Sequence, residues 1–114
     1  MLKVQFTRDK KADRFVALEM KGHAEAGQAG EDIICAAMSI LSFALVNNIE
    51  RMTGIVPAVK TDEEAGYLWL HLADDLAQDD EEVIQTLFWH TFLAMRDDVA
   101  ALNPDFVQVE LVLK

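Results

Sequence analysis

Residues 32–54 read DIICAAMSILSFALVNNIERMTG, and this stretch predicts the helix on which the fold depends. Asp32 is a favourable N-cap for a helix that begins at Ile33, and Gly54 is suited to end it. The apolar residues form one stripe at helical spacing: Ile34, Met38, Leu41, Leu45, Ile49 and Met52. The longest mostly apolar run, Ile33–Val46, is shorter than the roughly 20 residues that cross a bilayer. We therefore expect a buried helix and no membrane span.

Two strands are predicted before this helix, because apolar and polar residues alternate there. In the first strand, Leu2, Val4 and Phe6 share one face. The second strand runs over residues 15–20, and its expected core face is Val16, Leu18 and Met20. A charged turn joins the two strands, so they form a hairpin.

Three further strands and a second helix are predicted after residue 54. The strands cover Pro57–Thr61, Tyr67–Leu72 and Phe106–Leu113. Inward residues are expected to be Leu68, Leu70, Leu72, Val107, Val109, Leu111 and Leu113. The acidic run 79–82 complements the positive end of the second helix, which stops at Asn103-Pro104 and carries the stripe Ile84, Leu87, Phe88, Thr91, Phe92, Met95 and Val99.

The resulting element order is ββαββαβ over a single domain, residues 1–114. We predict an α+β two-layer sandwich with a five-stranded sheet and two helices on one face. Tyr67, Trp69 and His71 then project from the uncovered sheet face. Phe43, Trp89 and Leu93 lie off the helical stripes, and this surplus apolar surface indicates association with another chain.

The charge of the chain excludes several classes of partner. Ten Lys and Arg stand against 20 Asp and Glu, which gives a net charge of −10 and a pI near 4.5. Nucleic acid and anionic membranes require clustered basic residues, so neither is expected as a partner, and a basic partner is favoured. The N-terminus has no signal-peptide pattern, so we expect a cytoplasmic protein.

Cys35 is the single cysteine and occupies the predicted first helical turn. Backbone N–H groups and the helix dipole favour an anion there, and a thiolate is such an anion. His23 begins a glycine-rich loop that ends where this helix begins, so loop closure would pair the two as a Cys–His dyad. Amides of the first turn would then hold an oxyanion. From the residues alone, a core cysteine and a turn histidine are the more common interpretation, and the dyad is the alternative.

Other chemistries at these residues are disfavoured. A zinc site needs four ligands, and His23 and Cys35 supply only two. His71 and His90 are not spaced in the sequence as further ligands of such a site. No metal or other cofactor is therefore expected. A thiol redox role lacks a second, resolving cysteine.

The triplet Gly22-His23-Ala24, followed by Gly30-Glu31-Asp32-Ile33-Ile34-Cys35-Ala36-Ala37-Met38-Ser39, resembles the bacterial ribosomal-processing cysteine protease family called Prp. The similarity runs nearly end to end, although Ala94 stands where a glycine is expected. The resemblance implies a homodimeric endopeptidase that removes a short N-terminal extension from a large-subunit ribosomal protein. It makes Cys35 the nucleophile and His23 the base.

The resemblance also implies roles for the neighbours of this pair. Gly22, Gly27 and Gly30 would act as hinges of the loop. Asp32 either orients His23 or caps the helix, and capping is preferred. Ser39 either supports the pocket by hydrogen bonding or is an ordinary helix serine. The alternative function is a non-catalytic module that holds the ribosomal protein and in which Cys35 is structural.

Overall fold

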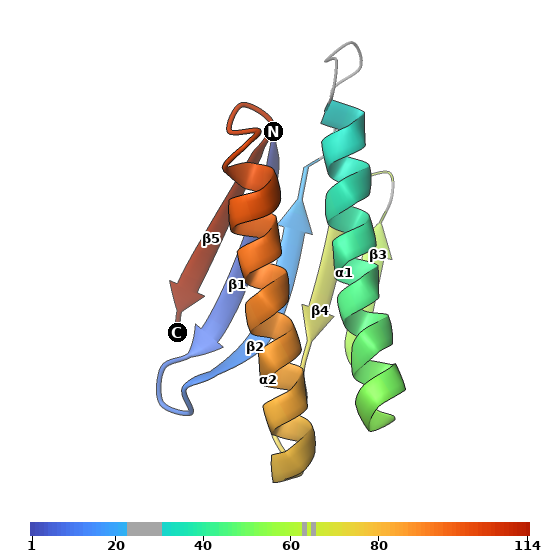
Figure 1. Ribbon diagram of the computed structural model, residues 1–114, viewed down its shortest axis with the longest axis vertical. Helices are drawn as coiled ribbons and strands as arrows, with labels where there is room; N and C mark the ends of the chain where they lie inside the picture. Colours follow the sequence, from blue (N-terminus) through green and yellow to red (C-terminus); the bar gives the residue numbers. More distant parts are fainter. Residues whose placement is uncertain (23–30, 63, 65) are drawn as a thin grey trace.

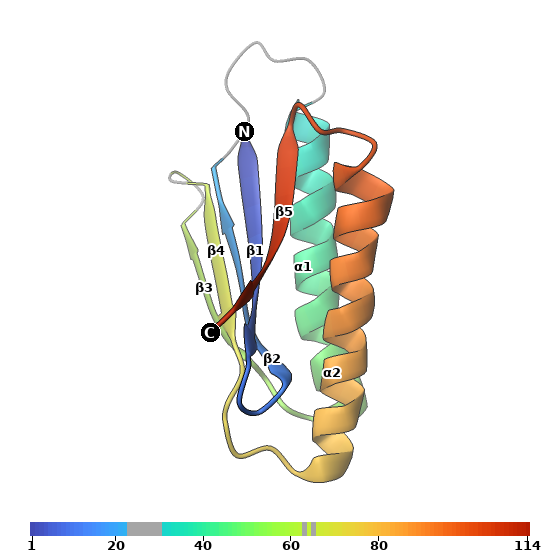
Figure 2. The same ribbon diagram turned by 90° about the vertical axis from the view of Figure 1, so that its left-hand side faces the viewer.

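The elements follow the predicted order ββαββαβ in a two-layer α+β fold. The computed structural model describes residues 1–22, 31–62, 64 and 66–114, and for residues 31 and 32 the backbone only. Its elements are β1 (Leu2–Asp9), β2 (Arg14–Lys21), α1 (Glu31–Thr53), β3 (Ala58–Asp62), β4 (Tyr67–His71), α2 (Gln78–Leu93), η1 (Ala94–Ala100) and β5 (Val107–Leu113). Both helices cover the same face of the sheet (Figures 1 and 2).

The strand order in the sheet is β3-β4-β2-β1-β5. All neighbouring pairs are antiparallel except β1 and β5, which run parallel. The two edges of the sheet are therefore β3 and β5. The predicted inward residues of β1 and β4 are confirmed, since Leu2, Val4, Phe6, Leu68, Leu70 and Leu72 are all buried.

A bulge in β2 corrects one predicted core residue. The register of β1 and β2 shifts between Thr7 and Arg8, which pair with Ala17 and Phe15, so Val16 is the extra residue. The shift turns Phe15 into the core, where it is fully buried, and leaves Val16 half-buried. The Phe15 ring stacks on Phe88 at 5.6 Å between centroids. The expectation that Val16 faces the core was wrong because simple alternation does not anticipate a bulge.

Helix α1 is buried on one side only. Met38, Leu45 and Ile49 are buried, whereas Ile33, Ile40, Phe43 and Met52 are exposed at 73%, 67%, 46% and 62%. Met52 therefore does not belong to the buried stripe. Gly54 ends the helix as predicted, with φ of +77° and its N–H bonded to the Glu50 carbonyl.

By length and composition alone, Ile33–Thr53 is apolar enough to cross a membrane. The shortness of the run Ile33–Val46 therefore does not exclude a membrane span. The core helix of a folded domain can have the same length and hydropathy as a membrane span. The packing of α1 residues in the hydrophobic core favours a core helix here.

The C-terminal part of the chain departs from the prediction at two places. The second helix continues as the π-helical segment η1, which begins at Ala94. In β5, Val107 is buried as expected, but Leu111 and Leu113 are exposed at 40% and 62%. Edge position agrees with their exposure, because β5 has a neighbouring strand, β1, on one side only in the described sheet.

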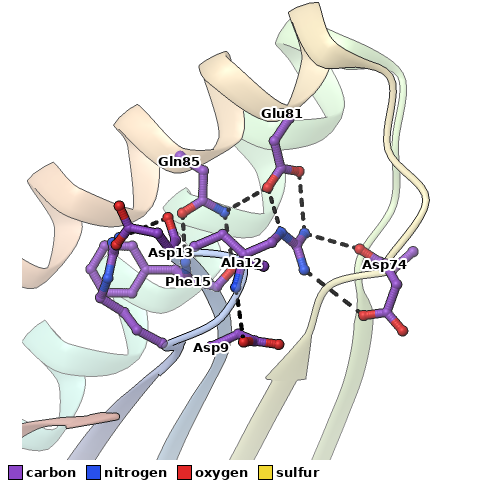
Figure 3. Close-up of polar contacts among 10 residues, drawn as sticks. Asp9, Ala12, Asp13, Phe15, Asp74, Glu81 and Gln85 are labelled. Atoms are coloured by element: carbon purple, nitrogen blue, oxygen red, sulfur yellow. Dashed lines mark hydrogen bonds and ion pairs between the residues drawn. The ribbon is translucent and has the colours of Figure 1, made fainter. Parts of the chain in front are cut away.

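A polar cluster fixes the β1–β2 hairpin to α2 (Figure 3). The Gln85 side chain accepts a hydrogen bond from the Phe15 N–H at 2.6 Å and donates one to the Phe15 carbonyl at 2.9 Å. Arg14 forms an ion pair with Glu81 and donates to the Ala73 carbonyl. The backbone N–H and C=O of Phe15, next to the bulge, are thus both hydrogen-bonded by the Gln85 side chain of α2.

Candidate active site

A hollow of about 350 Å³ lies where the N-terminal part of α1 meets the sheet. We call it the thiol hollow, since Cys35 is part of its wall. Helix α1 supplies Cys35, Ser39 and Phe43. The rest of the lining comes from the ends of the strands and from the β3–β4 connection, with Leu2, Met20, Gly22, Thr61, Asp62, Gly66, Tyr67 and Leu68. The end of β2 and the start of α1 lie at the same end of the molecule in both views (Figures 1 and 2).

Cys35 sits slightly deeper in the helix than predicted. Helix α1 begins at Glu31, so Cys35 is its fifth residue and Asp32 lies inside the helix instead of preceding it. The predicted helix start at Ile33 was wrong, and with it the expected third helical position of the thiol. Cys35 is half-buried and reaches the thiol hollow at the end of the first turn, where the influence of the helix dipole begins to fall off.

Gly22 has a conformation that only glycine tolerates well. Its φ is +99°, and a Cβ atom there would lie 2.6 Å from the carbonyl oxygen of Met1. Gly22 therefore fixes where the chain leaves β2, at the wall of the thiol hollow. The next residue is His23, which lies outside the described residues, as do Gly27 and Gly30.

Ser39 lies one helical turn after Cys35 and lines the same hollow. This placement agrees with a supporting role in the pocket. The predicted roles of Asp32 stay predictions, because its side chain lies outside the described part of the chain.

The chemical character of the thiol hollow is mixed. Leu2, Met20 and Leu68 are apolar parts of its lining, whereas Asp62 and Tyr67 contribute polar groups. Sequence reasoning missed most of these residues as site candidates. The available signals were the off-stripe position of Phe43 and the acidic turn after β3, but neither indicates which residues the fold brings to a cysteine.

Tyr67 is held as a neutral hydroxyl. Partial burial, together with the hydrogen bond of 3.1 Å that its hydroxyl donates to Glu19, raises the pKa of the Tyr67 phenol. The hydroxyl is thereby directed to Glu19, which pairs with Trp69 on the uncovered sheet face, and not toward Cys35.

The other two histidines lie away from this hollow. His71 stacks on Trp69 at 5.4 Å on the uncovered sheet face, and His90 is exposed on α2. Across residues 1–22, 31–62, 64 and 66–114, no group of three or more His, Cys, Asp and Glu residues is arranged to hold a metal ion.

Comparison with known proteins identifies the family. The family model described as "Cysteine protease Prp" matches residues 1–108. The chain belongs to the cysteine protease Prp family. The resemblance read from the His23 and Cys35 segments is thereby confirmed at the level of the family.

Curated Prp proteins are similar to most of this chain. The ribosomal processing cysteine protease Prp of Bacillus subtilis is 28% identical over 72 residues, which are 63% of this chain and 64% of the relative. The protein of the same name from Staphylococcus aureus strain Mu50 is 32% identical over 68 residues, with 60% and 64% coverage. The alignment thus spans less than two thirds of the length of these relatives.

Solved structures share the fold over nearly the whole length of the chain. The structure of SMU.848 from Streptococcus mutans has a TM-score of 0.85 and 31% identity, and the match covers 100% of this chain and 96% of that one. The structure of an essential ribosomal processing protease Prp from S. aureus with a substrate peptide has a TM-score of 0.83 and 21% identity, with 97% and 99% coverage. The two-layer fold is therefore the Prp fold.

Proposed function

We propose that this protein is a cysteine endopeptidase with Cys35 as nucleophile and His23 as general base. The observation that carries the proposal is the position of Cys35 in the wall of a hollow that Gly22 also lines. His23 follows Gly22 directly in the sequence, which supports the proposed pairing with Cys35. Membership of a family of cysteine proteases supports the same roles.

The proposed reaction is hydrolysis of a peptide bond through a thioester. The imidazole of His23 takes the proton of the Cys35 thiol, and the sulfur attacks the carbonyl carbon. The carbonyl oxygen becomes an oxyanion, which N–H groups of the first turn of α1 would stabilise. As the C–N bond breaks, His23 returns the proton to the leaving amine. Water, deprotonated by the same imidazole, then hydrolyses the thioester and restores the thiol.

The proposed substrate is the N-terminal segment of a large-subunit ribosomal protein, from which a short extension is removed. The S. aureus relative was solved with a substrate peptide and also with a covalently linked product peptide, and its name describes ribosomal processing. The net charge of −10 supports a basic substrate, since it attracts such a chain at low salt. Cleavage before ribosome assembly would take place in the cytoplasm, and the proposed chemistry needs no metal or other cofactor.

We also propose that the protein forms a homodimer through α1. The exposed residues Ile33, Ala36, Ile40 and Phe43 follow one another at spacings of three and four residues on the side that faces away from the sheet. This is the spacing of a helix that packs on another helix. A second copy of the same helix, related by a twofold axis, would bury this stripe.

The experiment that tests the endopeptidase uses a peptide that spans the N-terminus of the host ribosomal protein. The wild-type protein and Cys35→Ser are each incubated with the peptide, products are identified by mass spectrometry, and binding is measured by calorimetry. We expect cleavage by the wild type alone, with binding retained by the variant. Binding without cleavage by either protein would favour the non-catalytic module. Neither binding nor cleavage would show that this ribosomal protein is not the substrate.

A further inference from the structure

Strand β3 is exposed over its whole length. It forms one edge of the sheet and pairs with β4 on one side only. All five of its residues are exposed. Figure 2 shows β3 at the outer edge of the sheet, with the helices on the far side of the molecule. In the described part of the chain, the outer side of residues 58–61 has no neighbouring strand, so another extended chain can pair there.

The helix layer leaves even the inner side of β3 uncovered. Val59 and Thr61 pair with Leu70 and Leu68, which are core residues exposed at 0% and 5%. Val59 is nevertheless 37% exposed, and Thr61 belongs to the exposed residues of the strand. An extended chain that paired with β3 would thus find open surface beside the strand on the helix side.

This open edge leads into the thiol hollow. Thr61 and Asp62, the last residues of β3, line the hollow together with Cys35. Phe43 of α1 lines it too and is 46% exposed. The opposite edge strand, β5, contributes no residue to the lining. Of the two edge strands, only β3 ends at the thiol hollow, so a chain paired with β3 would run toward Cys35.

We propose that the polypeptide substrate binds in extended form as an additional strand on the outer edge of β3, which carries its scissile bond to Cys35. This inference rests on the proposed function. Backbone hydrogen bonds along β3 would supply affinity without regard to sequence, and alternate substrate side chains would point to the helix side and the open side of the sheet. The side chains on the helix side would pack on Val59 and then enter the thiol hollow.

A second copy of this chain is the other possible occupant of β3, and two observations argue against it. The strand is short and carries Lys60 at its centre, which are features that discourage edge-to-edge pairing of identical sheets. The exposed apolar stripe on α1 already offers a larger surface for self-association.

The first test leaves the protein unchanged and alters the substrate backbone. A series of cleavable peptides carries one N-methyl group each, at successive positions on either side of the bond that is cut. Loss of one backbone hydrogen bond should raise KM about five- to tenfold. We expect this rise at every second position, because only alternate N–H groups of a paired strand face β3. A uniform effect at all positions, or no effect at any, would overturn the proposal.

Hydrogen exchange locates the pairing. Amide exchange of the wild-type protein is compared with and without the product peptide, and the β5 amides serve as the internal control. The expected result is slower exchange at alternate β3 amides only when peptide is present. Protection of β5 instead, or protection of β3 that depends on protein concentration without peptide, would overturn the proposal. Cleavage by the wild type without β3 protection refutes this inference alone, whereas absence of cleavage refutes the proposed function.

Discussion

Gly22, directly after β2, and Cys35 of α1 line the same hollow, although β2 and α1 belong to different layers of the fold. The strand end and the helix start are thus held together at the place where the proposed chemistry occurs. Gly22 achieves this through a backbone that approaches the Met1 carbonyl too closely for any side chain. A side chain at residue 22 would therefore both destabilise the fold and displace the wall of the thiol hollow.

We predict that Gly22→Ala destabilises the protein more than Gly54→Ala does. Both glycines have positive φ, of +99° and +77°, so both substitutions carry a backbone cost of about 1 kcal/mol. Only at Gly22 would the new Cβ meet a backbone atom, the Met1 oxygen at 2.6 Å, whereas nothing lies within 4 Å of a Cβ at Gly54. Urea unfolding should show about 1–3 kcal/mol of additional loss for Gly22→Ala. Equal losses for the two variants would contradict this account of the β2 end.

The Gln85 side chain is predicted to be a major stabilising contact between the layers. Gln85→Ala removes both hydrogen bonds to the backbone of Phe15 and leaves two partly buried polar groups without their partner. We expect a loss of about 2–4 kcal/mol in the free energy of unfolding. The control is Gln78→Ala, because Gln78 is exposed and its side chain donates a hydrogen bond to the exposed Glu82, so it should cost less than about 0.5 kcal/mol. Similar losses for both glutamines would show that the Phe15 contacts contribute little.

Acid should weaken the β1–β2 turn through Asp9. Hydrogen bonds from the backbone N–H groups of Ala12 and Lys11 to the Asp9 carboxylate hold the pKa of Asp9 below its ordinary value of 3.8. Because the folded pKa is depressed, the charged form stabilises the fold above the unfolded pKa, and this contribution is lost as the pH falls through the folded pKa. Wild type should therefore be more stable than Asp9→Asn above about pH 4, and the difference should shrink below it. A difference that stays constant from pH 6 to pH 2 would refute this assignment.

Self-association should depend on the outer stripe of α1. Ile40 is 67% exposed near the middle of this stripe, so Ile40→Asp would place a charge at the centre of the proposed interface. Sedimentation equilibrium should show a dimer for the wild type and at least about a tenfold weaker dimer for the variant. Gln108→Asp, on the exposed surface of β5, is the matched control and should leave the dimer intact. A monomeric wild type, or an unchanged Ile40→Asp dimer, would contradict this interface.

Patterns with a simple period were predictable from the sequence. The alternation in β1 and β4 and the acidic first turn of α2 depend on neighbours along the chain, and the structure confirms them. Phe15 was missed as a core residue because a bulge breaks the period of two. The exposure of Leu111 and Leu113 was missed because it depends on β5 being an edge strand, which only the sheet order reveals.

The candidate site was predictable only in part. Cys35 stands out as the single cysteine near a helix start, and Ser39 follows from helical geometry. Thr61, Asp62 and Tyr67 come from strands far along the chain, so their place beside the thiol depends on the pairing of β3 with β4 and of β4 with β2. Local sequence carries no signal for such contacts.

Peptide cleavage by active-site variants tests the central claim most directly. The rate constant kcat for the ribosomal-protein peptide is measured for the wild type, Cys35→Ala and His23→Ala, with His90→Ala on the exposed face of α2 as the control. We predict no detectable cleavage by Cys35→Ala, a loss of about 10²- to 10⁴-fold for His23→Ala and wild-type turnover for His90→Ala. Cleavage by Cys35→Ala, or full activity of His23→Ala, would contradict the assignment of Cys35 as nucleophile and His23 as base.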